Sequence, residues 1–222
     1  MSKRMNGLLA PPMALLLPPL LVAAMALLAP HAAHAQAGLV VNAGARSGGG
    51  FESADGTRQE LALRGSAAAS LAFEWPYDDH RAWQVWLARQ RTRLVLGSAA
   101  ATPGTPGEMP LVLTTLQLGG VNYFDSPGGR SPSGPYVAGG LGLTHLAPDL
   151  AGTSARTRWS MSLALGHEWP LAGSVSWRAE LRAHVTLLNS EGGFFCSGGC
   201  TVFIRGDTLT QVEALVGLRV GF

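Results

Sequence analysis

The chain has 222 residues, of which 47% are hydrophobic and 14% charged, with 16 basic and 14 acidic side chains. This composition excludes an intrinsically disordered chain, and the near-neutral charge balance argues against a general nucleic-acid-binding protein. The length fits one large domain or two small ones.

Residues 1–35 are typical of a secretory signal peptide. Lys3 and Arg4 supply the positive start, residues 8–29 form an uncharged apolar stretch, and Ala33-His34-Ala35 places small residues at cleavage positions. Several prolines within the apolar stretch disfavour the alternative of a permanent membrane-spanning helix. We therefore expect the protein to be exported.

Residues 36–222 form the expected mature domain, which contains fourteen arginines, fourteen acidic residues and no lysine. Apolar and polar side chains alternate with a period of two, which predicts strands rather than helices. The clearest case is 173–188, where seven apolar side chains alternate with seven polar ones. Eight strands are expected in chain order: 38–46, 60–75, 82–95, 111–124, 135–147, 156–169, 173–188 and 208–222.

Strands of ten or more residues are longer than the five or six residues usual in a soluble sandwich. They match the tilted strands that cross a bilayer, where the sheet must close so that no backbone edge faces lipid. We therefore expect an all-β fold, an eight-stranded antiparallel transmembrane barrel with up-and-down meander topology. A soluble lipocalin-like barrel is the structural alternative, but it needs a polar exterior that the charge-free tracks of four strands do not provide.

The connections between the strands alternate in length. With a periplasmic N-terminus, the longer ones (47–59, 96–110, 148–155 and 189–207) face the outside, and the shorter ones (around 76–81, 125–134 and 170–173) face the periplasm. Two strands enter short turns with the same tripeptide, Glu74-Trp75-Pro76 and Glu168-Trp169-Pro170. Aromatic side chains gather near these turns and suggest one interfacial girdle: Phe73, Trp75, Tyr77, Trp83, Tyr123, Phe124, Tyr136, Trp169, Trp177 and Phe222.

These features resemble the small outer-membrane β-barrels of Gram-negative bacteria, the class that contains the OmpA membrane domain, OmpX and OmpW. The resemblance covers residues 38–222 and includes the C-terminal segment QVEALVGLRVGF. In that class, a terminal Phe preceded by alternating apolar residues is the signal for the barrel-insertion machinery. The resemblance implies this role for Val216, Leu218, Val220 and Phe222, and a monomer embedded in outer-membrane lipid.

The charges of the strands suggest a basic lumen. Ten arginines and five glutamates occupy candidate inward positions, and the acidic surplus lies in loops and turns. In strand 82–95, Arg89, Arg91 and Arg93 share a track with Trp83 and Leu87, so an inward direction requires a bulge near residue 88. The simplest interpretation is a lumen plugged by Arg–Glu pairs, with a polar network of Arg178, Glu180, Arg182, His184, Glu213 and Arg219.

A second hypothesis is a basic collar at the outer rim. It consists of Arg46, Arg91, Arg93, Arg156 and Arg158, at the outer ends of their strands, and would bind phosphates of surface lipid or anions at a pore mouth.

The two cysteines, Cys196 and Cys200, lie four residues apart in a glycine-containing segment. An exported loop is oxidising, so we expect a small-loop disulfide. Two roles remain open for it, a clip that stiffens the last outer loop and a recognition knob that exposes two phenylalanines. A redox role has less support, because no neighbouring group activates either thiol.

An enzyme interpretation rests on His184 and Glu213 with Ser160 or Ser162 on a neighbouring strand, which is a conceivable nucleophile–base arrangement for a lipid hydrolase. Serines and a histidine are also expected in a polar lumen without catalysis, so we expect no enzyme. No phosphate loop, metal-ligand cluster or nucleic-acid module occurs in the sequence, and we expect no cofactor. The favoured function is structural or surface-interacting, with a narrow OmpW-like channel and a lipid-modifying enzyme as alternatives.

Overall fold

The computed structural model describes residues 37–53, 61–95, 108–124, 133–149, 153–188, 204–205 and 208–222. Residues 34–221 belong to one compact unit. None of the described residues contribute to a helix long and apolar enough to cross a membrane. The expected signal peptide and both cysteines lie outside the described residues.

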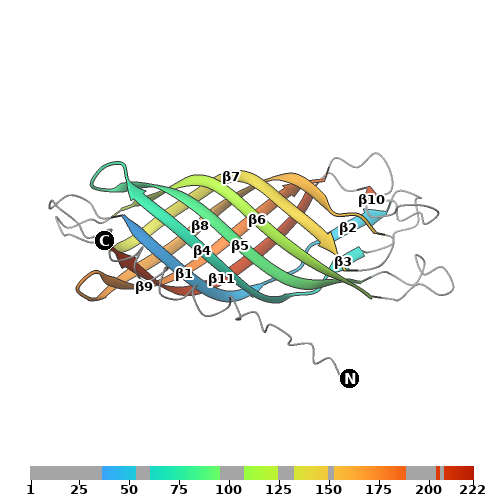
Figure 1. The fold of residues 1–222 in the computed structure, drawn as a ribbon, viewed down its shortest axis with the longest axis horizontal. Coiled ribbons are helices and arrows are strands. Elements are labelled where there is room, and N and C mark those ends of the chain that lie inside the picture. The colour runs from blue at the N-terminus through green and yellow to red at the C-terminus, as the bar shows by residue number, and fades with distance from the viewer. Residues whose placement is uncertain are drawn as a thin grey trace, which may run out of the picture. The chain divides into compact units, whose positions relative to one another are not determined.

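Eight long strands form the unit: β1 (Gly38–Arg46), β4 (Ser66–Pro76), β5 (Arg81–Val95), β6 (Glu108–Tyr123), β7 (Gly134–Pro148), β8 (Arg156–Ala172), β9 (Val175–Leu187) and β11 (Thr208–Gly221). Three short strands accompany them: β2 (Gly50–Ser53), β3 (Leu61–Leu63) and β10 (Ile204–Arg205). Each long strand pairs antiparallel with the next one in the chain, and β1 also pairs with β11, which closes a barrel (Figure 1). This confirms the predicted eight-stranded antiparallel barrel.

The two ends of the barrel differ in their connections. At one end, residues 77–80 join β4 to β5, and residues 173–174 join β8 to β9. Gly173 has a φ of 58°, which the tight two-residue turn requires. We name this the turn end, and the opposite end, where β2, β3 and β10 lie, the loop end (Figure 1).

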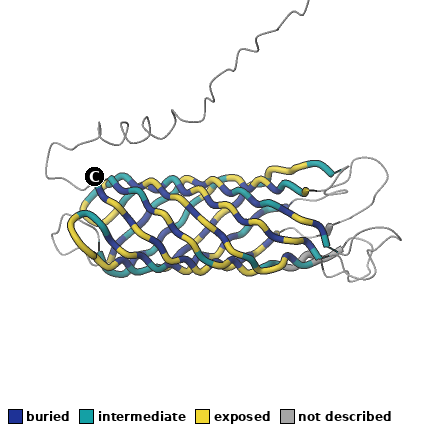
Figure 2. The backbone as a smooth tube through the Cα atoms, turned by 60° about the horizontal axis from the view of Figure 1, so that its bottom comes forward, coloured by how far each residue is buried: buried dark blue, intermediate teal, exposed yellow. Residues whose placement is uncertain are grey.

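The wall of the barrel separates its residues into two tracks. Along β11, buried and exposed residues alternate over the whole strand, and Figure 2 shows the same alternation around the barrel. The exposed track carries large apolar side chains such as Leu141, Leu163 and Leu165, each more than 60% exposed. A soluble protein rarely exposes so many apolar side chains together, whereas lipid is the solvent that this surface requires.

The inward direction predicted for the arginines of β5 is wrong, because the strand lacks the bulge that this direction requires. β5 pairs with β6 without interruption from Arg81 to Val95, and its inward track is Gln84, Trp86, Ala88, Gln90, Thr92 and Leu94. Arg89, Arg91 and Arg93 therefore continue the outward track of Trp83 and Leu87 and are exposed. The regular alternation of the strand decides their direction, because without a bulge no residue changes face.

A second correction concerns the segment that precedes β4. The sequence pattern predicts Arg64 inward and Leu63 outward, but Leu63 is buried and Arg64 is exposed. The chain is irregular at Arg64 and Gly65, two successive exposed residues between β3 and β4. This irregularity inserts one residue into the alternation and reverses the phase of the strand.

The aromatic girdle is present at the turn end, with two exceptions. Trp75 lies opposite Trp83, and Trp169 lies opposite Trp177, all on the outward track. Tyr123 and Tyr136, also predicted to belong to the girdle, are buried inside the barrel, so that part of the prediction is wrong. Their hydroxyl groups bond to carboxylates of the lumen, which gives them a polar interior role.

Candidate functional site

The lumen contains charged side chains in equal numbers. Four arginines and four glutamates of the described residues are buried: Arg46, Arg178, Arg182, Arg219, Glu74, Glu168, Glu180 and Glu213. The predicted surplus of positive charge in the lumen is therefore wrong, because five of the ten arginines are exposed and Arg158 is only half-buried. The exposed five are Arg64, Arg89, Arg91, Arg93 and Arg156. The lumen is instead filled by matched ion pairs, as the simplest interpretation of the sequence predicts.

Arg178 is the centre of the network at the turn end. Its Nη1 donates to Glu74 Oε1 at 2.7 Å, and its Nη2 donates to Glu168 Oε2 at 2.6 Å. Tyr123 also donates its hydroxyl to Glu168 Oε2 at 2.9 Å. One guanidinium thus binds two carboxylates from different strands, in the charge-assisted geometry that favours arginine over lysine.

The repeated tripeptide has a structural explanation. In both copies the glutamate, Glu74 or Glu168, points inward and binds Arg178, while the tryptophan beside it points outward and pairs with another tryptophan. The polar network predicted from the sequence includes neither glutamate. Both belong to the five glutamates that the alternation places inward, and the repeat was the signal that could have linked them to one partner.

A second group of polar side chains continues from Arg178 toward the middle of the barrel. Arg182 Nε donates to Glu180 Oε1 at 2.7 Å, and Tyr136 donates its hydroxyl to Glu180 Oε2 at 2.8 Å. Arg182 also reaches Gln84 on the opposite wall, at 3.2 Å. These bonds cross the lumen and leave its cross-section occupied by side chains.

His184, Glu213 and Arg46 meet in the loop-end half of the lumen. Arg46 Nη2 lies 2.7 Å from Glu213 Oε2, and His184 Nε2 lies 2.9 Å from the same oxygen. Trp86 stacks on the His184 ring at a centroid distance of 5.0 Å. Arg46 and Arg182 approach the Trp86 ring within 6 Å, at cation–π distances. Trp86 is a further lumen residue that the sequence pattern did not single out.

Beyond this group, the loop end of the lumen is apolar. Eight buried side chains form one cluster there: Leu63, Leu94, Met109, Leu111, Leu113, Leu146, Leu188 and Leu209. The lumen therefore has a charged turn-end half and an apolar loop end, an arrangement that the sequence did not predict.

The catalytic arrangement considered from the sequence is not assembled. Ser162 Oγ donates to Gln117 Oε1 at 2.6 Å, and Ser160 Oγ accepts from Gln117 Nε2 at 3.3 Å. The His184 nitrogen that faces a partner, Nε2, bonds to Glu213 and Arg46, and no described serine bonds to His184. A general base must lie within hydrogen-bond reach of its nucleophile, so this geometry gives the enzyme hypothesis no support.

The five arginines of the predicted collar do not share one surface. Arg46 is buried in the lumen, Arg91 and Arg93 face outward on β5, Arg158 is half-buried and Arg156 is exposed at the start of β8. What the structure forms instead is a basic outer surface made of three arginines of β5 and of Arg64, whose backbone N–H donates to the Arg93 carbonyl oxygen at 2.9 Å. We call Arg64, Arg89, Arg91 and Arg93 the β5 arginine face.

Two residues of this face share one counter-ion. Arg64 Nη2 lies 2.6 Å from Glu108 Oε1, and Arg93 Nη1 lies 3.1 Å from Glu108 Oε2. Within the described ranges, Arg89 and Arg91 have no ion-pair partner. Among the described residues, the face therefore carries four positive charges and one negative charge, and Glu108 pairs with neither Arg89 nor Arg91.

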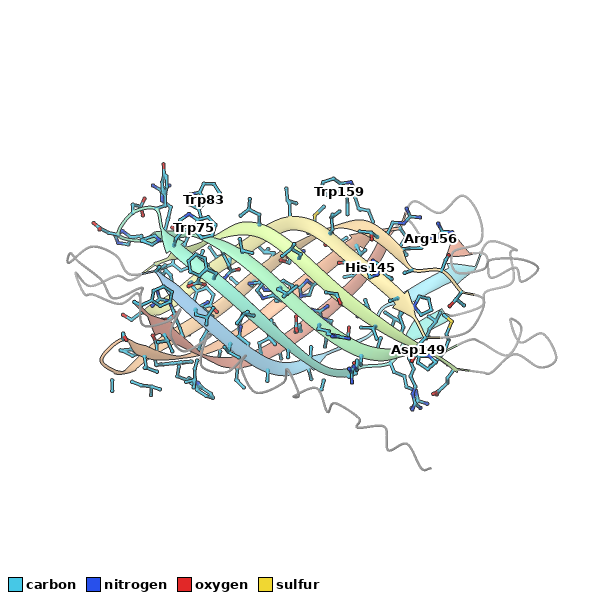
Figure 3. The ribbon with its side chains drawn as sticks, in the orientation of Figure 1. Trp75, Trp83, His145, Asp149, Arg156 and Trp159 are labelled. Carbon is cyan, nitrogen blue, oxygen red and sulfur yellow. The ribbon has the colours of Figure 1, made fainter. Side chains whose placement is uncertain are left out.

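The boundary of the apolar exterior lies beside Arg89. Four outward residues opposite one another on β5–β8 are apolar, namely Leu87, Leu116, Leu143 and Trp159. The next outward set toward the loop end is polar, namely Arg89, Thr114, His145 and Thr157. Figure 3 shows that Trp159 and His145 lie farther toward the loop end than Trp75 and Trp83. The arginine face thus begins where the apolar band ends.

Comparisons with known proteins agree with this architecture at the level of the fold. Neisserial surface protein A is 18% identical over 83% of this chain and 97% of that chain, with a TM-score of 0.50. The outer membrane protein AlkL, solved in lipid bilayers, is 14% identical over 87% and 94% of the two chains, with a TM-score of 0.53. The chain has the fold of the small outer-membrane β-barrels. No protein-family model matches the sequence, and neither does any curated protein sequence.

The apolar exterior and the eight closed strands thus confirm the transmembrane β-barrel expected from the sequence, with the fold of the small outer-membrane barrels. Val216, Leu218 and Val220, three residues of the expected insertion signal, lie on the outward track of β11, and Phe222 follows that strand in the chain. Their recognition by the insertion machinery stays a prediction, as do the disulfide between Cys196 and Cys200 and the monomeric state.

Proposed function

We propose that this outer-membrane barrel has a structural and surface-interacting role, in which the β5 arginine face binds phosphate groups of anionic glycolipid in the outer leaflet. The observation that carries the proposal is the run of outward arginines at alternating positions of one strand, Arg89, Arg91 and Arg93. The expected topology places the loop end, and this face with it, on the cell-surface side.

The depth of the arginines supports binding to headgroups. An arginine on the lipid-facing track costs about 2–4 kcal/mol at the bilayer midplane but only about 0–1 kcal/mol near the interface. Leu87 and Trp159 mark the last apolar positions before the arginine face, and tryptophan favours the interface. The guanidinium groups therefore lie at the level of lipid phosphates, beyond the hydrocarbon.

The chemistry of the face suits phosphate. Arg89 and Arg91 are two residues apart on a strand, so their Cα atoms are about 7 Å apart and both side chains can reach one phosphorylated headgroup. Arginine binds phosphate through two parallel hydrogen bonds. Thr114, which lies opposite Arg89 on β6, adds a hydroxyl at the same level.

The filled lumen supports a structural role over conduction. Ion pairs around Arg178 and the apolar cluster at the loop end occupy the interior of an eight-stranded barrel, which is only wide enough for side chains. We expect the purified protein to show no steady conductance in a planar bilayer. Stable single-channel steps from the wild-type protein would favour the OmpW-like channel instead.

The lipid proposal is tested with the double variant Arg89→Gln/Arg91→Gln. The barrel is purified in mild detergent, and the lipopolysaccharide that remains bound is quantified for each protein. We expect a reduction of about tenfold, because both unpaired guanidinium groups are lost, and partial retention in Arg89→Lys/Arg91→Lys, which keeps charge without the bidentate geometry.

The matched control is Arg81→Gln, which removes an exposed arginine from the turn end of the same strand. This variant removes one positive charge outside the arginine face and should leave the amount of bound lipopolysaccharide unchanged. Equal lipopolysaccharide on the wild type and the double variant would contradict the proposal.

A further inference from the structure

A groove crosses the outside of the barrel near the turn end. It has a volume of about 450 Å³ and extends over β5, β6, β7 and β8. Its floor is Gly120 and Gly139, which lie opposite each other, with Trp83 beside Gly120 and Leu163 beside Gly139. We call it the glycine groove. Its volume lies within the range of small-molecule sites, about 300–1,000 Å³.

The two glycines create the hollow. Four outward positions lie opposite one another across β5–β8, namely Trp83, Gly120, Gly139 and Leu163. The two glycines have no side chain, so exposed backbone lies between the large side chains of Trp83 and Leu163. A Cβ atom at Gly139 would lie 3.1 Å from the Ser162 carbonyl oxygen, and one at Gly120 would lie 3.3 Å from the Ala82 carbonyl oxygen. Any larger side chain at these positions would fill the groove. Toward the loop end, large apolar residues including Leu118 and Leu141 continue the exterior.

The other end of the groove is polar. Arg81 and Asn122, which lie opposite each other, and Tyr77 line it on the turn side. Arg81 Nε donates to Asp78 Oδ2 at 2.7 Å, and its guanidinium lies 5.1 Å from the centre of the Tyr77 ring. The groove is therefore apolar toward the middle of the barrel, and Arg81 at its polar end forms an ion pair with Asp78 of the adjoining turn.

Asp78 is held in place by the turn. Its Oδ1 accepts the backbone N–H groups of His80 and Arg81, at 3.0 and 2.8 Å. The hydrogen bond from the Arg81 side chain, together with these backbone bonds, lowers the pKa of Asp78 from its ordinary value. The Asp78 carboxylate and the Arg81 guanidinium are thus both charged at neutral pH. The polar end of the groove therefore has a negative and a positive group three residues apart in the chain.

We infer that the glycine groove binds one zwitterionic aminophospholipid of the inner leaflet, with an acyl chain on the glycine floor, the phosphate at Arg81 and the ammonium group at Asp78. This site goes beyond the proposed function, because it lies at the opposite end of the barrel and takes a different lipid. A headgroup of both signs complements the Arg81–Asp78 pair, whereas a purely anionic headgroup would place its charge beside the Asp78 carboxylate.

The shape of the groove favours a chain over a second barrel. Trp83 and Leu163 project into the surroundings, with exposures of 47% and 63%, and the glycine floor lies between them. A flexible acyl chain can enter this recess and cover the exposed backbone. The wall of another barrel would first meet the projecting Trp83 and Leu163 side chains.

The experiment uses the full-length protein in nanodiscs that contain equal amounts of phosphatidylethanolamine and phosphatidylglycerol. After transfer to mild detergent, native mass spectrometry measures which lipid stays bound and how many per barrel. We expect one retained phosphatidylethanolamine, preferred at least fivefold over phosphatidylglycerol. Retention of neither lipid, or of both equally, would overturn the inference.

Two sets of variants test the two parts of the site. Gly120→Leu, alone and with Gly139→Leu, fills the floor and should lower retention at least fivefold. Asp78→Asn keeps the acceptor for the backbone N–H groups and removes the charge, so it should abolish the preference for phosphatidylethanolamine without unfolding the barrel. Unchanged retention in the leucine variants, or an unchanged preference in Asp78→Asn, would contradict the inference.

Two further readouts distinguish lipid binding in the glycine groove from lipid binding at the arginine face and from contact between two barrels. Arg89→Gln/Arg91→Gln should keep the bound phosphatidylethanolamine while it loses lipopolysaccharide, so the two proposals can fail independently. A wild-type mass of two barrels that becomes one barrel in Gly120→Leu would overturn the lipid site in favour of a second copy of this chain.

Discussion

The two ends of the lumen are filled by different interactions. At the turn end, Arg178 binds Glu74 and Glu168, and each group depends on the others for its charge to be balanced. At the loop end, leucines and one methionine pack without directional bonds. Side chains fill the lumen at both ends. The comparison shows that a barrel lumen can be filled either by a coupled network of ion pairs or by independent apolar contacts. Substitutions at the two ends should therefore have unequal and differently distributed effects.

The largest effect is expected from Arg178→Met, which tests the coupling at the turn end. The substitution removes the arginine that pairs with buried Glu168 and one of the two that pair with Glu74, and removing one partner of a buried pair costs about 3–5 kcal/mol. The free energy of unfolding is measured by urea titration in lipid vesicles, with tryptophan fluorescence and heat-modifiable gel mobility as probes.

The control for Arg178→Met is the double variant Arg178→Met/Glu168→Gln. It removes one cation and one carboxylate together and leaves Glu74 its ion pair with Arg219, and replacing a buried ion pair with neutral groups is often nearly neutral for stability. We expect the double variant to recover most of the loss. If it is as unstable as the single variant, the network is not coupled through charge.

A smaller effect is expected from Leu113→Ala at the loop end. Truncation of a buried leucine costs about 2–5 kcal/mol, and we expect about 2 kcal/mol because the cluster lies at the end of the barrel, where neighbours can relax. The matched control is Leu141→Ala on the outward track, a leucine that is 65% exposed to the surroundings. The same urea titration should show a clearly smaller loss there, and an equal loss would mean that the loop-end cluster is not a packed core.

The next effect concerns the boundary between the two ends, where His184 bonds to Glu213 and stacks on Trp86. His184→Gln keeps a polar side chain but changes the bond and the stacking, so we expect a loss of about 1 kcal/mol. Glu213 keeps its bond to Arg46 in this variant, which limits the effect. A loss as large as that of Arg178→Met would show that the coupled network extends to the loop-end half.

The smallest effect is expected outside the lumen, at Asp78 in the turn between β4 and β5. Because the pKa of this carboxyl is lowered in the folded protein, its ion pair with Arg81 persists from neutral pH to below the ordinary aspartate range. The contribution is lost only as the pH falls through the folded pKa. NMR shifts of the His80 and Arg81 amides should report this titration, and a midpoint above the ordinary aspartate value would contradict it.

The fold could be predicted from the sequence because its pattern is repetitive. Each of the eight strands alternates along its length, and the closure of the sheet follows from the requirement that no edge faces lipid. The prediction failed at positions where a local irregularity decides which residues face inward. The irregularity at Arg64 and Gly65 reverses the alternation before β4, and nothing in the residue types marks it strongly.

The error at Arg89, Arg91 and Arg93 has a different cause. An inward direction for these residues keeps charge off the lipid-facing track, and it requires a bulge that the strand does not contain. The cost of an outward charge depends on depth, and depth follows from where the apolar band ends on the neighbouring strands. That boundary becomes visible only when the strand register sets Leu87 beside Leu116 and Arg89 beside Thr114.

The lumen network could be predicted in composition but not in connectivity. The alternation along the strands places the four arginines and the four glutamates of the network inside the barrel. The same alternation did not prevent the assignment of Tyr123 and Tyr136 to the membrane girdle, although both are buried. The alternation of residues along a strand shows which residues share a face, but it shows which face is inward only when the register of the strand is known. Aromatic rings suit both the lumen and the lipid-facing surface of the barrel. Glu168 lies opposite Arg178 on the neighbouring strand, but the pairing of Arg178 with Glu74, 104 residues away in the chain, depends on the three-dimensional closure of the barrel.

Arg46 and Glu213 face each other across β1 and β11, the first and last strands of the barrel. Their ion pair stabilises, from the lumen side, the β1–β11 pairing at which the sheet closes on itself. A chain whose ends have not yet met exposes an unpaired cation on one edge and an unpaired anion on the other, so both groups remain hydrated until closure. Completion of the sheet replaces that water with the ion pair, and re-opening the seam requires both buried charges to be hydrated again or left unpaired.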